Sequence, residues 1–203
     1  MIREAEDRMY RNKLLESKSA RHALISSLEQ SLWEIDFETK EHASRMQNMA
    51  LRMGQAFKLP SNQLDELALL ATLHDIGKIA IAKSILMKRE KLTPEEWEVI
   101  KKHPEIGYRI ANSSQDLLPI AEAILTHHEW WNGKGYPQGL RGEEIPLISR
   151  IISIIDAYDV MIHGRPYKMA QSQEEASNEL RRCSGTQFDP HLVKVFIKTV
   201  IGV

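Results

Sequence analysis

The stretch LALLATLHDIGK, residues 67–78, carries an apolar helix directly into a run of ionisable side chains. Leu67 and Ala71 recur at helical spacing and predict a buried helix face. His74 continues that face, and Asp75 lies next to it. Because burying an unpartnered charge or imidazole costs roughly several kcal/mol, these two residues need a chemical reason to be there.

Ionisable side chains interrupt other apolar helix faces in the same way. They are Glu38 and His42, which share a face with Met46, Met49 and Met53; His127 and His128, which follow Ile120, Ala121 and Ile124; and Asp156, which follows Ile152 and Ile155. One buried histidine is usually a satisfied core residue. Ionisable groups on four separate helices favour a shared metal centre, because cations offset the desolvation of carboxylates and hold imidazoles neutral.

The residue types narrow the choice of metal. Imidazole and carboxylate without thiolate suit iron or manganese, and less often zinc, nickel or cobalt. The carboxylate of Asp75 has two oxygens and can bridge two ions, while His127 and His128, as consecutive helical residues about 100° apart, can serve different ions. Two ions roughly 3.5–4 Å apart can hold the attacking and leaving oxygens of a phosphodiester.

The rest of the chain also favours helices. The capping sequences that begin at Thr93 and Ser172 predict two helix starts, no segment alternates like a strand, and residues 133–139 form a glycine-rich loop. Residues 3–34 predict a polar helix with a narrow apolar stripe. Its stripe residues Leu24, Leu28, Leu32 and Ile35 suit a two-helix seam, so we expect a parallel homodimer through this helix. The alternative is that the helix folds back on its own domain. We therefore divide the chain into a linker or coiled-coil helix, 1–35, and a globular domain, 36–203.

Composition excludes several classes of protein. The 203 residues carry 27 Lys and Arg against 28 Asp and Glu, a net charge of -1, which argues against a nucleic-acid-binding module. No run approaches the roughly 18 apolar residues of a membrane-spanning helix, and we expect no signal peptide. The single cysteine, Cys183, excludes an internal disulfide and suits a reducing cytoplasm.

Four ordered motifs resemble the HD-GYP family, a branch of the HD-domain metal-dependent phosphohydrolases. They are HDIGK at 74–78, HPEIG at 103–107, HHEWWNGKGYP at 127–137 and IIDAYDVM followed by RPYK between 154 and 168. The resemblance covers about residues 36–200. It implies an all-α HD-domain helical bundle around a centre of two or three divalent metal ions, preceded here by a long connecting helix.

The family's metal ligands match eight positions of this sequence: Glu38, His42, His74, Asp75, His103, His127, His128 and Asp156. Asp75 is then the bridging, catalytic carboxylate, and Lys78 a second catalytic residue that contacts a phosphate oxygen or the attacking water. The matching substrate-binding residues are Lys78, the loop Gly135, Tyr136 and Pro137, and the basic residues Arg165 and Lys168. Asn132 stands where the family usually has an acid, so one acidic contact is absent.

The resemblance implies a phosphodiesterase that cuts cyclic di-GMP, a bacterial second messenger, to linear pGpG and, with a second cut, to GMP. Two alternatives stay open: an HD phosphohydrolase for another cyclic dinucleotide such as cyclic GMP-AMP, and a non-catalytic cyclic-dinucleotide sensor or partner-docking module. Residues 5–13, AEDRMYRNK, are similar to the last helix of a GGDEF (diguanylate cyclase) domain. This weaker similarity implies an upstream GGDEF or sensor domain whose signal travels through the connecting helix.

Overall fold

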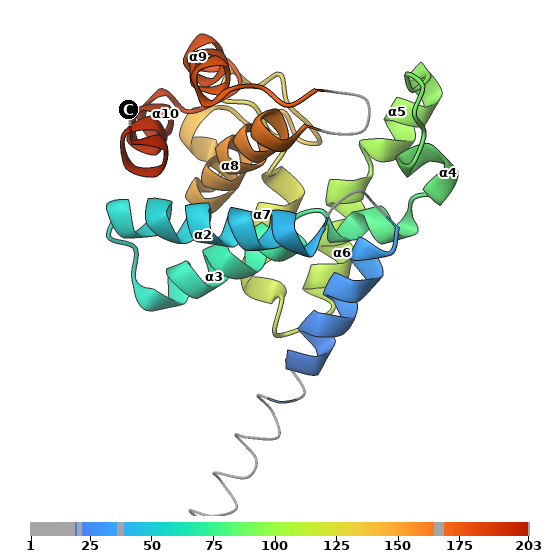
Figure 1. Ribbon diagram of the computed structural model, residues 1–203. Helices are drawn as coiled ribbons and strands as arrows, with labels where there is room; N and C mark the ends of the chain where they lie inside the picture. Colours follow the sequence, from blue (N-terminus) through green and yellow to red (C-terminus); the bar gives the residue numbers. More distant parts are fainter. Residues whose placement is uncertain (1–18, 20–21, 36–38, 165–168, 203) are drawn as a thin grey trace, which may run out of the picture.

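A computed structural model describes residues 19, 22–35, 39–164 and 169–202 of the chain (Figure 1). Residues 22–33 are helical and precede the bundle. The first bundle elements are α2 (Lys40–Ala56), α3 (Ser61–Leu73), the 3-10 turn η1 (Ile76–Ala80), α4 (Lys83–Leu86), α5 (Pro94–Ile100) and α6 (His103–Asn112). They are followed by α7 (Leu118–Thr126), the 3-10 turn η2 (Gly142–Glu144), α8 (Leu147–His163), α9 (Gln173–Cys183), α10 (Pro190–Phe196) and the π-helical turn η3 (Ile197–Ile201).

The architecture is all-α, as predicted. No strand occurs in the described ranges, where pairing is limited to two isolated bridges, Asn132 with Arg141 and Ser184 with Phe188. The capping boxes predicted at Thr93 and Ser172 are both confirmed: each hydroxyl accepts a backbone N–H three residues on, and the glutamate there bonds back. A search of the described helices finds none with the length and apolar character needed to cross a membrane.

The core lies where α2 packs along α3 and α8, and α3 along α7. Met46 and Met53 of α2 and Ile152 and Ile155 of α8 are fully buried in it. This packing brings together the ionisable residues that interrupt the apolar helix faces, among them His42, His74, Asp156 and the pair His127 and His128. The fold thus converts a sequence pattern spread over more than a hundred residues into one site.

Two glycines set the distance between η1 and α6. A Cβ atom on Gly77 would lie 1.9 Å from the backbone oxygen of His103 and 2.6 Å from the backbone nitrogen of Gly107. A Cβ on Gly107 would in turn lie 3.2 Å from the nitrogen of Gly77. Only glycine allows this backbone-to-backbone approach, which places Asp75 and Lys78 against the start of α6.

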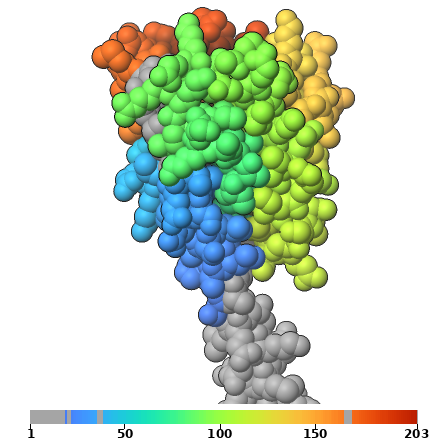
Figure 2. Space-filling model, turned by 90° about the vertical axis from the view of Figure 1, so that its right-hand side faces the viewer, coloured from blue at the N-terminus to red at the C-terminus, as the bar shows by residue number. Residues whose placement is uncertain are grey.

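The N-terminal helix differs in part from the expectation of a stripe too narrow to join a core. Leu32 is fully buried in the main core, and Leu28 packs against that core. Lys83 Nζ also donates to the backbone oxygen of Glu34 at 2.9 Å. Two of the four predicted seam positions are therefore covered by the chain's own domain, whereas Leu24 is 37% exposed. Figure 2 shows the described part of this helix, in dark blue, at the lower end of the molecule.

Candidate metal centre

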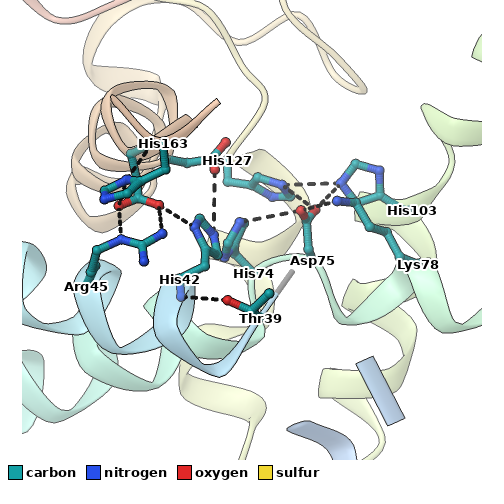
Figure 3. Close-up of polar contacts among 11 residues, drawn as sticks. Thr39, His42, Arg45, His74, Asp75, Lys78, His103, His127 and His163 are labelled. Atoms are coloured by element: carbon teal, nitrogen blue, oxygen red, sulfur yellow. Dashed lines mark hydrogen bonds and ion pairs between the residues drawn. The ribbon is translucent and has the colours of Figure 1, made fainter. Parts of the chain in front are cut away.

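Asp75 stands at the middle of the polar cluster (Figure 3). Its Oδ1 lies 2.8 Å from His103 Nε2 and 3.5 Å from His127 Nε2. Its Oδ2 lies 3.5 Å from His74 Nε2 and 2.6 Å from Lys78 Nζ. The two oxygens of one buried carboxylate therefore face two different sets of side chains, the arrangement that a bridging ligand needs.

The two sets meet the geometric requirement for metal ligands. In each, one ligand atom per residue lies within 4.8 Å of all the others. We call the set of Asp75, His103, His127 and His128 the His103 group, and the set of His42, His74 and Asp156 the His42 group. Seven of the eight predicted ligand residues thus come together.

Backbone carbonyls fix the tautomers of two rings in the His103 group. The Nδ1 of His103 lies 2.8 Å from the backbone oxygen of Ile100, and the Nδ1 of His127 lies 2.6 Å from that of Ile124. A carbonyl can only accept, so both Nδ1 atoms carry hydrogen, and in the neutral ring each Nε2 then presents a lone pair. Those two Nε2 atoms are 3.3 Å apart and both face the Asp75 carboxylate. With both rings neutral, these three acceptors repel one another unless a cation lies among them, either a metal ion or a proton held between a ring and Asp75.

Unpaired buried acceptor atoms indicate that the His42 group also suits a bound cation. His42 Nε2, His74 Nε2 and Asp156 Oδ1 are buried, and none has a hydrogen-bond partner in the described chain. Burial lowers the pKa of His74 to about 4, against the opposing effect of Asp75 and Asp156. Burial likewise holds the pKa of His128 well below its usual range. The nearby His127 and His103 lower it further, by smaller effects. Both rings are neutral at pH 7 and available as ligands. This buried cluster of histidine and aspartate fits a divalent metal site.

Sequence analysis missed the residue that holds His42. Asp159 of α8 is buried, and its Oδ2 lies 2.7 Å from the Nδ1 of His42, which is labelled in Figure 3. Arg45 donates two hydrogen bonds to the same carboxylate, at 2.7 and 2.8 Å, and His163 Nδ1 lies 3.1 Å from it. Burial alone would raise the pKa of Asp159, but the bonds from Arg45 and His42 lower it to about 2. The permanently charged carboxylate turns the Nε2 of His42 towards the centre.

His163 therefore bonds within α8, to the backbone oxygen of Asp159 at 3.0 Å and to its carboxylate. The missed signal was the spacing: Asp159 and Arg45 each lie three residues after a predicted ligand, on the same helix face.

His127 and His128 do not diverge as consecutive helical residues would. Helix α7 ends at Thr126, so both histidines lie in the turn that follows it. Their ring centroids are 4.1 Å apart, and both belong to the His103 group. The 100° rule of a regular helix does not apply past the helix end.

The loop that contains Tyr136 closes over His128. The two rings stack, with centroids 4.9 Å apart and an interplanar angle of 26°, and burial raises the pKa of the Tyr136 phenol. Gly135 lies against the backbone of residues 129–130, since a Cβ there would be 2.2 Å from the nitrogen of Trp130. The peptide bond before Pro137 is cis.

Buried Glu129 is a second residue that sequence analysis did not single out. It accepts backbone N–H groups from Gln138 at 2.6 Å, Gly139 at 3.1 Å and Leu140 at 3.1 Å. A carboxylate that accepts several backbone donors is a strong organiser of a loop. Asn132, at the position of the absent acid, caps the same loop by accepting the N–H of Lys134 at 3.0 Å.

The cluster forms the floor of a cavity of about 740 Å³. Asp75, Lys78, His103, His128 and Asp156 line this floor together with Tyr136. Lys78 is itself buried, and its ammonium group contacts Asp75 at the cavity surface. Glu38, Arg165 and Lys168, which completed the predicted site, lie outside the described residues.

Comparisons with known proteins agree with this geometry. The family model of the HD domain matches residues 27–192. The chain is 37% identical to a cyclic di-GMP phosphodiesterase of Thermotoga maritima over 94% of this chain and 57% of that protein. It is also 37% identical to the cyclic di-GMP phosphodiesterase response regulator RpfG of Xanthomonas campestris, over 86% of this chain and 47% of that one. The chain thus spans about half the length of these curated relatives.

A third relative, the 3'3'-cGAMP-specific phosphodiesterase 2 of Vibrio cholerae, is 34% identical over 92% of this chain and 36% of its own length. Among solved structures, a cyclic GMP-AMP-specific phosphodiesterase of V. cholerae superimposes with a TM-score of 0.67 at 25% identity, over 88% of this chain and 48% of that chain. The HD domain of the Listeria monocytogenes phosphodiesterase PgpH superimposes with a TM-score of 0.63 at 18% identity, over 86% and 93% of the two chains, and shows the common fold. The chain therefore belongs to the HD-domain family, and within it to the HD-GYP branch that its four motifs resemble.

Proposed function

We propose that this domain is a metal-dependent phosphodiesterase that hydrolyses cyclic di-GMP to pGpG and, with a second cut, to GMP. The observation that carries the proposal is the convergence of His103 Nε2, His127 Nε2 and Asp75 Oδ1, three acceptors that need a shared cation. Two relatives named as cyclic di-GMP phosphodiesterases support the substrate.

The two groups of side chains would hold two divalent ions, with Asp75 between them, and Glu38 is the proposed further ligand of a third. Iron or manganese is the metal we propose, because the ligands are imidazoles and carboxylates without thiolate. Bound here, such ions supply Lewis-acid stabilisation to a phosphodiester and activate water for attack.

The chain's own residues would stabilise charge, limit the access of water and contact the substrate. Lys78 keeps a positive charge at the cavity floor, where it can stabilise negative charge on a non-bridging phosphate oxygen. Tyr136 covers His128 and limits the access of bulk water to that side of the floor. Arg165 and Lys168 remain proposed phosphate contacts, and Gly135, Tyr136 and Pro137 remain proposed substrate contacts. Hydrolysis adds one water across a 3′ phosphodiester and leaves the proton on the 3′ oxygen.

The competing function is hydrolysis of a different cyclic dinucleotide, which the V. cholerae relative named as cGAMP-specific favours. A side-by-side assay of cyclic di-GMP and 3'3'-cyclic GMP-AMP with the metal-loaded protein decides between them. We expect cyclic di-GMP to give the higher kcat/KM. A higher value for cyclic GMP-AMP would reverse the assignment, and binding of either without hydrolysis would make the domain a sensor.

We propose a cytoplasmic setting, in which the free thiol of Cys183 would stay reduced. We also propose that the N-terminal helix forms a homodimer and connects to an upstream GGDEF or sensor domain. Support comes from Leu24, the exposed seam residue, and from the greater length of the relatives. The GGDEF-like residues 5–13 lie outside the described part of the chain.

Leu24→Glu tests the seam while sparing the buried Leu32, because it places a charge on the exposed seam residue. We expect a monomer in solution that keeps its hydrolytic activity. A variant that stays dimeric would remove this helix from the dimer.

A further inference from the structure

One wall of the cavity has no role in the site described so far. It consists of residues 88–92, between α4 and α5, together with Trp97 of α5. The lining also includes the apolar residues Val160 and Met161 of α8 and Phe188 after α9, together with the acidic Glu179 of α9. In Figure 1, α4 and α5 stand out from the bundle on the side away from α10. The cavity therefore continues from the metal-binding floor along a separate, cationic side.

The charged side chains of this wall differ in whether they have an ion-pair partner. Lys88 Nζ contacts both carboxylate oxygens of Glu96, at 2.6 and 2.7 Å, which neutralises that lysine. Arg89 and Lys91 also line the cavity, and neither makes an ion pair with any residue that the structure describes. Glu90, between them, also lines the cavity, so with Lys88 offset by Glu96 the segment keeps a formal charge of +1, which favours an anionic ligand in a cavity whose floor already suits phosphate.

Trp97 adds a flat apolar surface beside these cations. It lines the cavity and is 45% exposed, so a large part of its ring is open to contact. The capping box between Thr93 and Glu96 fixes the first turn of α5, and the Lys88–Glu96 contact ties the preceding segment to it. The indole of Trp97 therefore projects from a helix whose first turn is fixed by these contacts.

We propose that this wall binds the half of the cyclic dinucleotide that is not being cut, with Arg89 and Lys91 on its phosphate and the Trp97 ring against a purine base. The inference rests on the proposed function. A cyclic dinucleotide carries two phosphates and two bases, and the metal-binding floor can act on one phosphodiester at a time. Cationic side chains recognise phosphate, and aromatic faces stack on bases with little sequence preference. The cavity volume lies within the range of roughly 300–1,000 Å³ for ligand sites.

The test compares two substrates of the metal-loaded protein. Cyclic di-GMP has a second phosphate and bases, whereas bis(p-nitrophenyl) phosphate offers a single phosphodiester without either. For the double variant Arg89→Ala/Lys91→Ala, we expect the KM for cyclic di-GMP to rise roughly tenfold or more, with the kcat retained. Hydrolysis of bis(p-nitrophenyl) phosphate should stay unchanged, and the salt dependence of the KM for cyclic di-GMP should weaken.

The matched control removes two exposed positive charges elsewhere. Arg109→Ala/Lys194→Ala changes the net charge equally, on α6 and α10 outside the cavity lining, and should leave both substrates unaffected. At Trp97, the Phe variant should keep most of the affinity, while the Leu variant should raise the KM about tenfold, because it keeps apolar area but loses the stacking face.

A KM for cyclic di-GMP that is equal in wild type and Arg89→Ala/Lys91→Ala would overturn the subsite and leave the proposed function standing. Equal losses on both substrates would overturn it too, because the wall would then act on the floor rather than on the second half of the ligand. A wild-type protein that cleaves bis(p-nitrophenyl) phosphate but no cyclic dinucleotide would instead refute the proposed function and the subsite with it.

Discussion

The two ligand groups are positioned by different means. In the His103 group, the rings of His103 and His127 bond to backbone carbonyls only three residues away, at Ile100 and Ile124. In the His42 group, the ring of His42 bonds to Asp159, which lies 117 residues further along the chain. One group is therefore oriented by local backbone, and the other by a side-chain network between α2 and α8. Rings held by backbone carbonyls should keep their orientation in most variants, because substitution leaves the carbonyl in place. In the network, the loss of a single side chain removes the contact that orients His42.

The largest effect is expected where the two groups meet. Asp75→Ala removes the carboxylate shared by both and should abolish hydrolysis together with most of the bound metal. Lys78→Ala should lower the rate but leave the metal content near that of wild type, since an ammonium cannot be a ligand. Metal analysis and hydrolysis rates of both variants check this. Equal metal loss in the two would contradict the division of roles.

Gly77→Ala tests the local side of the comparison. The added Cβ would collide with a backbone oxygen of His103 that cannot rotate away, so η1 must move off α6. We expect a loss of about 1–3 kcal/mol in unfolding free energy, at the upper end of that range, with reduced metal content. Denaturant unfolding and metal analysis measure the two effects.

Gly54→Ala is the matched control for that variant. Its Cβ would meet the end of the Leu64 side chain, at 2.4 Å, which can shift. It should cost less stability and leave the metal content intact. Metal loss equal to that of Gly77→Ala would show that the η1–α6 approach has no special part in the site.

Asp159→Asn tests the side-chain network. The amide is close in size to the carboxylate but lacks its charge, so the Nδ1 proton of His42 and the Arg45 guanidinium lose their anionic partner. Loss of such an outer contact typically weakens metal binding about 10- to 100-fold. We expect metal titrations to show weaker binding of one ion while another keeps its affinity.

His163→Ala should have a smaller effect, because that ring is more exposed and Arg45 still holds the carboxylate. Equal weakening of every ion by Asp159→Asn would refute the separate positioning of the two groups.

A smaller effect, shared by both groups, is expected from pH in the metal-free protein. The pKa of folded His74 is about 4, below its unfolded value near 6.5, so the unfolded chain binds protons first as the pH falls. Stability should therefore decline from about pH 6.5 towards 4, by up to about 1.4 kcal/mol per pH unit for this group alone. His128 acts in the same direction.

Denaturant unfolding at pH 7.5 and 5 in the presence of chelator measures this decline. Asp159, whose pKa is about 2, keeps its stabilising charge throughout that window and does not contribute. Unchanged or greater stability at pH 5 would show that these rings are not held neutral by burial.

The sequence predicted the helical class, two helix starts and the residues that converge, because burial patterns and motif spacing depend on local periodicity. It did not predict Asp159 or Glu129, whose roles depend on partners brought close only by folding. For the same reason the roles of Gly77 and Gly107 emerged only from the approach of two backbones. The covering of Leu28 and Leu32 by their own domain was the less favoured of two expectations, because a narrow apolar stripe does not identify its partner.

A metal count on the full chain purified without chelator, combined with a cyclic di-GMP assay before and after metal removal, tests whether the two ligand groups form a catalytic metal centre. We expect two or three iron or manganese ions per chain, loss of hydrolysis when they are removed, and recovery when they are restored. Fewer than one ion per chain, with hydrolysis unaffected by a chelator, would contradict it.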